Sequence, residues 1–100
     1  MFTPRYHNDQ TDRLVQALLA LETPEEAYRF LEDVLTVQEM KTITQRLEVA
    51  VMLRRKDTYQ EIVRETGAST TTIGRVNRTL QYGADGYGPI LDRLAKPQDT

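Results

Sequence analysis

The chain has 100 residues, a formal net charge of −2 and no cysteine. This length makes one small, marginally stable domain, and the lack of cysteine excludes a disulfide framework and thiolate chemistry. No apolar run approaches the length of a membrane span, and the first ten residues are too polar for a signal peptide, so we expect a cytoplasmic protein.

The first part of the chain predicts an arm and two amphipathic helices. Residues 1–9 are expected to form the arm, and leucine and valine at helical spacing predict a helix over residues 10–22. Thr23, Pro24 and Glu26 then supply an N-cap, a proline for the first helical position and a capping glutamate. They predict the start of a second helix, which carries its apolar residues along one face.

The third predicted helix, over residues 37–56, is the most apolar. Its run LEVAVML over residues 47–53 holds a single polar residue. A helix that is apolar nearly all round must be covered on several sides, and the neighbouring helices of so short a chain can scarcely cover it alone. A partner subunit is the economical explanation, and a monomer whose helices wrap this one completely is the alternative. Residues 10–56 are therefore expected to be dimerisation helices.

Residues 58–81 predict two short helices joined by a tight turn. Thr58 and Glu61 have the spacing of a capping box, and Gly67 ends the first helix where a left-handed residue is cheapest. Ser69 can cap the second helix. This spacing is typical of a helix-turn-helix, whose second helix enters the major groove of DNA. The same turn also packs two helices in proteins that never touch DNA.

The charges of the chain are distributed unevenly. Residues 41–80 carry eight basic and four acidic residues, whereas the remainder carries five basic and eleven acidic ones. Although the whole chain is mildly acidic, its positive charge is concentrated around the predicted helix-turn-helix, which favours a nucleic-acid partner.

The predicted contacts to double-stranded DNA lie in and around the second of these helices. They are Gln60, Ser69, Thr70, Thr71, Thr72, Arg75 and Arg78. Thr70 and Thr71 occupy the first exposed turn and are the predicted base contacts, while Ser69 and Thr72 are assigned to capping and phosphate contact. Arg78 can reach a phosphate or a guanine edge. The equally simple alternative is that Arg78 is a solvated surface residue without a contact to DNA.

The end of the chain adds one short helix and no catalytic chemistry. Residues 88–95 predict the last core helix, and residues 96–100 a tail. Six helices and no credible strand predict an all-α fold. No nucleophile–base pair or phosphate-cradling loop occurs at usable spacing, so the protein is not expected to be an enzyme. His7 has no second histidine or cysteine with which to hold a metal.

Two segments carry a resemblance to a known family. LTVQEMKTITQRLEVAVMLRR and ETGASTTTIGRVNRTL make the chain resemble the tryptophan repressor superfamily, and most closely its YerC/YecD branch, from about Leu14 to Leu94. The second segment is similar to the family pattern E-L-G-A-x-x-x-T-I-x-R. The resemblance implies a six-helix fold and an intertwined homodimer. It also implies that the first, second, third and last helices form a shared core, and that the fourth and fifth form one reading head per subunit.

The resemblance also implies a candidate effector pocket. In the tryptophan-responsive members two arginines sandwich the corepressor and the partner subunit adds a threonine, roles that fall here on Arg46, Arg75 and Thr36. Val76 and Gly74 depart from the family pattern, which has glycine and threonine there. A valine beside the slot is expected to crowd an indole, which argues against tryptophan. No cofactor is expected to be required, and the identity of any corepressor is left open. The two arginines are equally well explained as inter-helix ion pairs or phosphate contacts.

The sequence therefore predicts a sequence-specific transcriptional regulator, and more specifically a repressor. It is expected to bind a palindromic site as a homodimer through the helix-turn-helix, with or without an effector. The acidic net charge keeps one alternative open, namely an all-α dimeric protein-interaction module that has the helix-turn-helix shape and does not use it on DNA.

Overall fold

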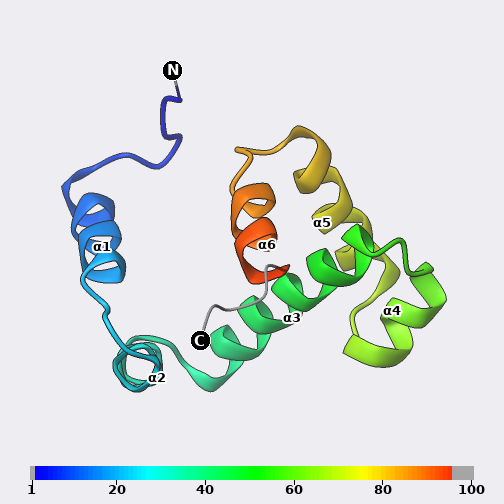
Figure 1. The fold of residues 1–100 in the computed structure, drawn as a ribbon, viewed down its shortest axis with the longest axis horizontal. Helices are drawn as coiled ribbons and strands as arrows, with labels where there is room; N and C mark the ends of the chain where they lie inside the picture. The colour runs from blue at the N-terminus through cyan, green and yellow to red at the C-terminus, as the bar shows by residue number, and fades with distance from the viewer. Residues whose placement is uncertain (1, 96–100) are drawn as a thin grey trace. The chain divides into compact units, whose positions relative to one another are not determined.

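A computed structural model describes residues 2–95 of the chain. The described residues form six α-helices and no strand, which confirms the all-α fold class. The helices are α1 (Asp9–Leu19), α2 (Pro24–Val34), α3 (Val37–Arg54), α4 (Tyr59–Thr66), α5 (Thr70–Tyr82) and α6 (Tyr87–Ala95), as Figure 1 shows. The chain divides into two compact units, residues 1–37 with α1 and α2, and residues 38–100 with the rest. The tail predicted for residues 96–100 lies outside the described part.

Local capping sets the helix ends, and some ends differ from the predicted positions. Helix α1 starts after Asn8, whose side chain accepts the backbone N–H of Thr11 at 2.8 Å, while the Thr11 hydroxyl accepts the backbone N–H of Asn8 at 2.9 Å. The sequence reading did not single out this reciprocal cap. Helix α1 ends at Leu19 rather than at residue 22. Helix α3 ends at Arg54 because Lys56 has a left-handed backbone, with φ at 69°.

The predicted start of the second helix is confirmed, with one change in its hydrogen bonds. Thr23 accepts the backbone N–H of Glu26 at 3.1 Å, and Pro24 occupies the first helical position. The Glu26 carboxylate does not return to Thr23. It accepts the backbone N–H of Glu22 at 2.9 Å, one residue earlier, and so orders the connection between α1 and α2.

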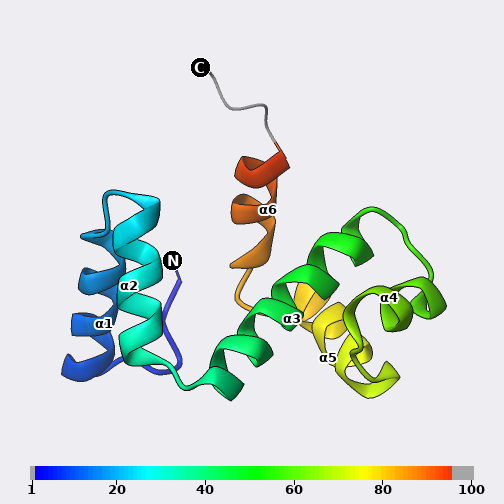
Figure 2. The same ribbon diagram turned by 90° about the horizontal axis from the view of Figure 1, so that it is seen from below.

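The core of the protein lies in the second unit. Figures 1 and 2 both show α5 beside the second half of α3, and α4 and α5 are the most closely packed pair of helices. The fully or nearly buried side chains come from every helix of this unit and from the turn before α5: Val49, Ala50, Met52, Ile62, Ala68, Ile73, Val76 and Leu91. This burial immobilises the helix-turn-helix against α3, because each helix contributes a branched or large side chain to one cluster.

Part of the apolar run of α3 is covered by the chain itself, while Leu47 of the same run is 38% exposed. Val49 and Ala50 are fully buried within a single chain, and Met52 is 3% exposed. The reason is that α4, α5 and α6 all supply side chains to the cluster around this half of the helix. Packing against helices far away in sequence thus covers part of the surface for which helical periodicity indicates no partner.

Apolar surface remains exposed elsewhere, mainly near the start of the chain. No described residue of α1 or α2 is buried. The large exposed apolar side chains of these helices and of the first half of α3 include Leu14, Val15, Leu18, Leu19, Val34, Val37 and Ile43. Surface of this kind marks a site of association when the side chains form a contiguous patch. Within residues 2–95, no helix combines the length and the apolar character needed to cross a bilayer.

Candidate nucleic-acid interface

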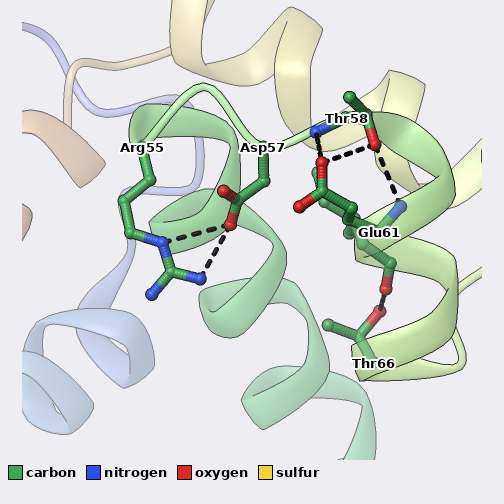
Figure 3. A network of polar contacts seen from close by, with 6 residues as sticks. Arg55, Asp57, Thr58, Glu61 and Thr66 are labelled. Atoms are coloured by element: carbon green, nitrogen blue, oxygen red, sulfur yellow. Dashed lines mark hydrogen bonds and ion pairs between the residues drawn. The ribbon is translucent and has the colours of Figure 1, made fainter.

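Helix α4 begins with the predicted capping box. Thr58 accepts the backbone N–H of Glu61 at 3.2 Å, and the Glu61 carboxylate accepts the backbone N–H of Thr58 at 3.1 Å (Figure 3). Immediately before it, the Arg55 guanidinium donates twice to the Asp57 carboxylate, at 3.1 and 2.7 Å. That hydrogen bond and the charge of Asp57 raise the pKa of Arg55 above its usual value. The connection from α3 to α4 is thus held by charge-assisted hydrogen bonds, which position the start of α4.

The turn between α4 and α5 has the geometry that its sequence predicts. Gly67 has a left-handed backbone, with φ at 72°, and its N–H donates to the carbonyl of Val63 at 2.9 Å. Ala68, 2% exposed, follows it into the core. On the other side the Gln45 amide of α3 donates to the carbonyl of Thr66 at 3.2 Å. The end of α4 is therefore anchored to α3 as well as to the turn.

Helix α5 presents one apolar face to the core and one polar face to solvent. Ile73 and Val76 are buried in the core cluster. The exposed side chains of α5 and of its N-cap include Ser69, Thr70, Thr71, Arg75, Arg78 and Tyr82. Because the inward face packs on α3 and α4, the outward face is a rigid surface, as a recognition helix requires.

The hydroxyl groups at the start of α5 divide into two kinds. Ser69 accepts the backbone N–H of Thr72 at 3.1 Å and also donates to the Thr72 hydroxyl at 3.1 Å. These two side chains serve the helix start, as predicted for capping. Thr70 and Thr71 are exposed, and the described hydrogen bonds do not include their hydroxyl groups. Their side chains are therefore available to a ligand.

The charge of the α5 surface is entirely positive. The helix contains Arg75 and Arg78 and no acidic residue, and both arginines are exposed without an ion pair among the described residues. Gln60, also exposed, lies in the first turn of α4. Cationic and amide donors beside free hydroxyl groups form the kind of surface that contacts phosphates and base edges.

One contact within the helix-turn-helix joins residues that the sequence reading did not bring together. The Asn77 amide nitrogen of α5 lies 3.4 Å from the hydroxyl of Tyr59, the first residue of α4, and donates a hydrogen bond to it. Eighteen residues separate the two positions, so no local motif connects them. In the sequence, the only indications of this contact are a tyrosine at the first position of α4 and an asparagine next to Val76 on α5.

The three residues of the candidate effector pocket are divided between the two units of the chain. Arg46 of α3 and Arg75 of α5 are both exposed in the second unit, whereas Thr36 belongs to the first unit. Val76 is 4% exposed and is a member of the core cluster. The pocket of Thr36, Arg46 and Arg75 stays a prediction.

A cleft of about 460 Å³ also opens in the second unit, beside the second half of α5. Its lining residues come from α3, α5, α6 and the connections that follow α3 and α5: Leu53, Arg54, Lys56, Asn77, Thr79, Leu80, Gln81, Asp85, Tyr87 and Gly88. None of the three residues of the predicted effector pocket lines this cleft.

Comparison with known proteins places these features in a family. The family model described as Trp repressor protein matches residues 9–95. The protein YerC of Bacillus subtilis (strain 168), which is uncharacterized, is 48% identical over 89 residues, covering 89% of this chain and 86% of YerC.

Two solved structures are similar along nearly their whole length. A TrpR-like protein from Eubacterium eligens ATCC 27750 is 48% identical, with a TM-score of 0.85 over 92% of this chain and 95% of that one. A candidate Trp repressor from Staphylococcus aureus is 45% identical, with a TM-score of 0.85 over 93% of each chain. The family comprises DNA-binding regulators and not enzymes. The match spans all six helices and the helix-turn-helix described above, and the chain therefore belongs to the Trp repressor family, in the branch that includes YerC.

Proposed function

We propose that this protein is a sequence-specific transcriptional regulator that reads double-stranded DNA with α5. The observation that supports the proposal is the outward surface of α5. It combines two exposed threonines on the first turn with two exposed arginines and no acidic residue. Its inward face is immobilised by Ile73 and Val76. In this arrangement Thr70 and Thr71 contact base edges. The DNA backbone is contacted, directly or with their support, by Gln60, Ser69, Thr72, Arg75 and Arg78.

The protein acts as a homodimer in this proposal. The support comes from α1 and α2, which bury no described residue, and from the first half of α3, where Val37 and Ile43 are exposed. Two helices without a buried side chain gain little stability from their own chain. A second copy that covers these faces would supply the missing burial, and two-fold symmetry would place two α5 helices on a palindromic site.

The regulation proposed is repression by occupancy of the site. A protein bound at a DNA site blocks the access of other proteins to that site, so repression requires no contact beyond those proposed for α5. Binding does not require a cofactor in this proposal, because the core side chains of this chain already position α5. The proposal places the protein in the cytoplasm.

Selection of bound sequences from a random duplex pool, at about physiological salt, tests the proposed function. We expect enrichment of a two-fold symmetric motif whose half-sites lie about one helical turn apart. An enriched motif without symmetry would contradict the dimer. Failure to retain any duplex, both with the protein alone and with a metabolite extract added, would contradict DNA binding and favour the protein-interaction alternative.

Replacing Arg78 with alanine is expected to weaken binding to the selected site and to random-sequence DNA by similar factors. Arg78 lies two turns beyond the first turn of α5, where a recognition helix contacts the backbone rather than base edges. Each lost phosphate contact reduces the slope of log K against log salt by about 0.9, so a dimer should lose about 1.8. Fluorescence anisotropy titrations between 50 and 200 mM salt, concentrations at which such slopes are measured, check this expectation.

The matched control is Arg29→Ala on α2, which removes the same charge from a residue already paired with Glu25. This variant should leave the slope unchanged. If Arg78→Ala weakens only the selected site and keeps the slope, then the guanidinium contacts a base and not a phosphate.

A further inference from the structure

We propose that Tyr59 is a phosphate-contacting residue whose hydroxyl group is oriented by Asn77. The inference rests on the proposed DNA binding and adds a contact that the sequence reading did not contain. Tyr59 donates its hydroxyl hydrogen to a DNA backbone phosphate, and Asn77 holds the tyrosine oxygen from the side of α5. Asn77 is thus a positioning residue, and Tyr59 touches the ligand.

The direction of the existing hydrogen bond leaves the tyrosine able to donate. The Asn77 amide nitrogen donates to the tyrosine oxygen at 3.4 Å. A phenolic hydroxyl has one hydrogen to donate as well as lone pairs to accept with. Since the bond to Asn77 uses a lone pair, the hydroxyl hydrogen is directed elsewhere. Tyr59 has no other hydrogen bond among the described residues, so this hydrogen is available to an acceptor from outside the protein.

The position of the pair places that hydrogen at the surface of the helix-turn-helix. Tyr59 is 40% exposed and opens α4, next to the exposed Gln60. Asn77 is half-buried on α5, between the buried Val76 and the exposed Arg78. The hydroxyl group therefore lies where the two helices meet. In a helix-turn-helix the first helix crosses the DNA backbone, and phosphate oxygens are the acceptors present there.

The long hydrogen bond from Asn77 is suited to orienting the Tyr59 hydroxyl group rather than to stabilising the fold. At 3.4 Å between partly exposed groups it contributes little to the free energy of unfolding. It does limit the side-chain torsions of Tyr59, because it holds the tyrosine oxygen beside α5. Holding the donor near its bound position reduces the entropy lost when the phosphate binds.

The test compares Tyr59→Phe with the wild-type protein on two duplexes, the selected site and a random sequence. Loss of two neutral hydrogen bonds per dimer should weaken binding to both duplexes about tenfold. The salt slope should not change, since a neutral donor displaces no counterion. The melting temperature should stay within about 1 °C of wild type, because the substitution removes one exposed atom.

The matched control is Tyr6→Phe, which removes the same atom from a residue that is 74% exposed and precedes α1. This control should bind both duplexes as the wild type does. If Tyr59→Phe also binds both as the wild type does, the proposed contact is overturned. A loss confined to the selected site would overturn it too, since it would assign Tyr59 to base recognition.

A double-mutant cycle with Asn77→Leu tests the positioning role. Leucine keeps the approximate shape of asparagine and removes the donor, so the tyrosine hydroxyl loses its orientation. In the Asn77→Leu background, Tyr59→Phe should then lower the affinity for DNA only about two- to threefold instead of tenfold. The reason is that the two side chains act through one hydrogen bond. Full additivity of the two substitutions would overturn the role of Asn77. These outcomes differ from a failure of the proposed function, in which the wild-type protein itself would bind neither duplex.

Discussion

Replacing Thr70 and Thr71 together with alanine is expected to weaken binding to the selected site by about 10- to 100-fold, and binding to random DNA by less than about twofold. Both side chains are exposed on the first turn of α5, and this turn of a recognition helix contacts base edges. Each base contact contributes about 1–3 kcal/mol of discrimination. Alanine removes both the hydroxyl group and the methyl group that can contact thymine, whereas the contacts of the arginines to the DNA backbone remain.

The measurement is a pair of titrations at one fixed salt concentration, because affinities at different salt cannot be compared. Thr79→Ala is the matched control on the same helix. Its hydroxyl donates to the carbonyl of Arg75 at 3.0 Å, two turns beyond the first turn. This control should retain the preference for the selected site. Equal losses on both duplexes for the Thr70 and Thr71 variant would show that the two threonines do not read sequence.

Introducing a charge at Ile43 is expected to dissociate the dimer. Ile43 is 50% exposed on the first half of α3, a surface that we assign to the partner subunit. An unpaired carboxylate in a subunit interface costs several kcal/mol. Ile43→Glu should therefore raise the dissociation constant of the dimer at least about 100-fold, since 1.4 kcal/mol corresponds to a factor of ten. Sedimentation equilibrium at micromolar concentration should then show a monomer.

The same variant should lose at least about 100-fold in affinity for a two-fold symmetric site, because a monomer contacts one half-site and loses the gain of linked binding. The control is Gln38→Glu, which adds the same charge at an exposed polar position of α3. Its association and DNA affinity should resemble those of the wild type. A dimeric Ile43→Glu variant would place the interface elsewhere, and a monomeric wild-type protein would contradict the dimer altogether.

The helix-turn-helix could be predicted from the sequence because its determinants are local. The capping box of Thr58 and Glu61 spans three residues, and each partner satisfies a backbone group of the other. Ser69 caps α5 by accepting the backbone N–H of Thr72 at 3.1 Å. Gly67 marks the turn because glycine adopts φ at 72° without the steric cost that a side chain brings. Such features depend only on neighbouring residues, so the residue types and their spacing in the sequence are enough to predict them.

The coverage of α3 could not be predicted, because it depends on helices far away in sequence. The run over residues 47–53 is indeed apolar, yet Val49 and Ala50 are fully buried by their own chain. Periodicity indicates that a surface must be covered, and it does not indicate which segment covers it. Exposed apolar side chains lie mainly on α1, α2 and the first half of α3, and Leu47 of the run is itself 38% exposed.

The sequence by itself determined where the helices of the reading head begin, which glycine turns the chain and which exposed side chains follow that turn. Only the tertiary structure decided that Gln45 holds the end of α4 and that Asn77 holds the hydroxyl of Tyr59. Both contacts join residues about twenty positions apart. Their formation depends on the angles at which packed helices cross, and those angles follow from how all the buried side chains fit together rather than from any local pattern.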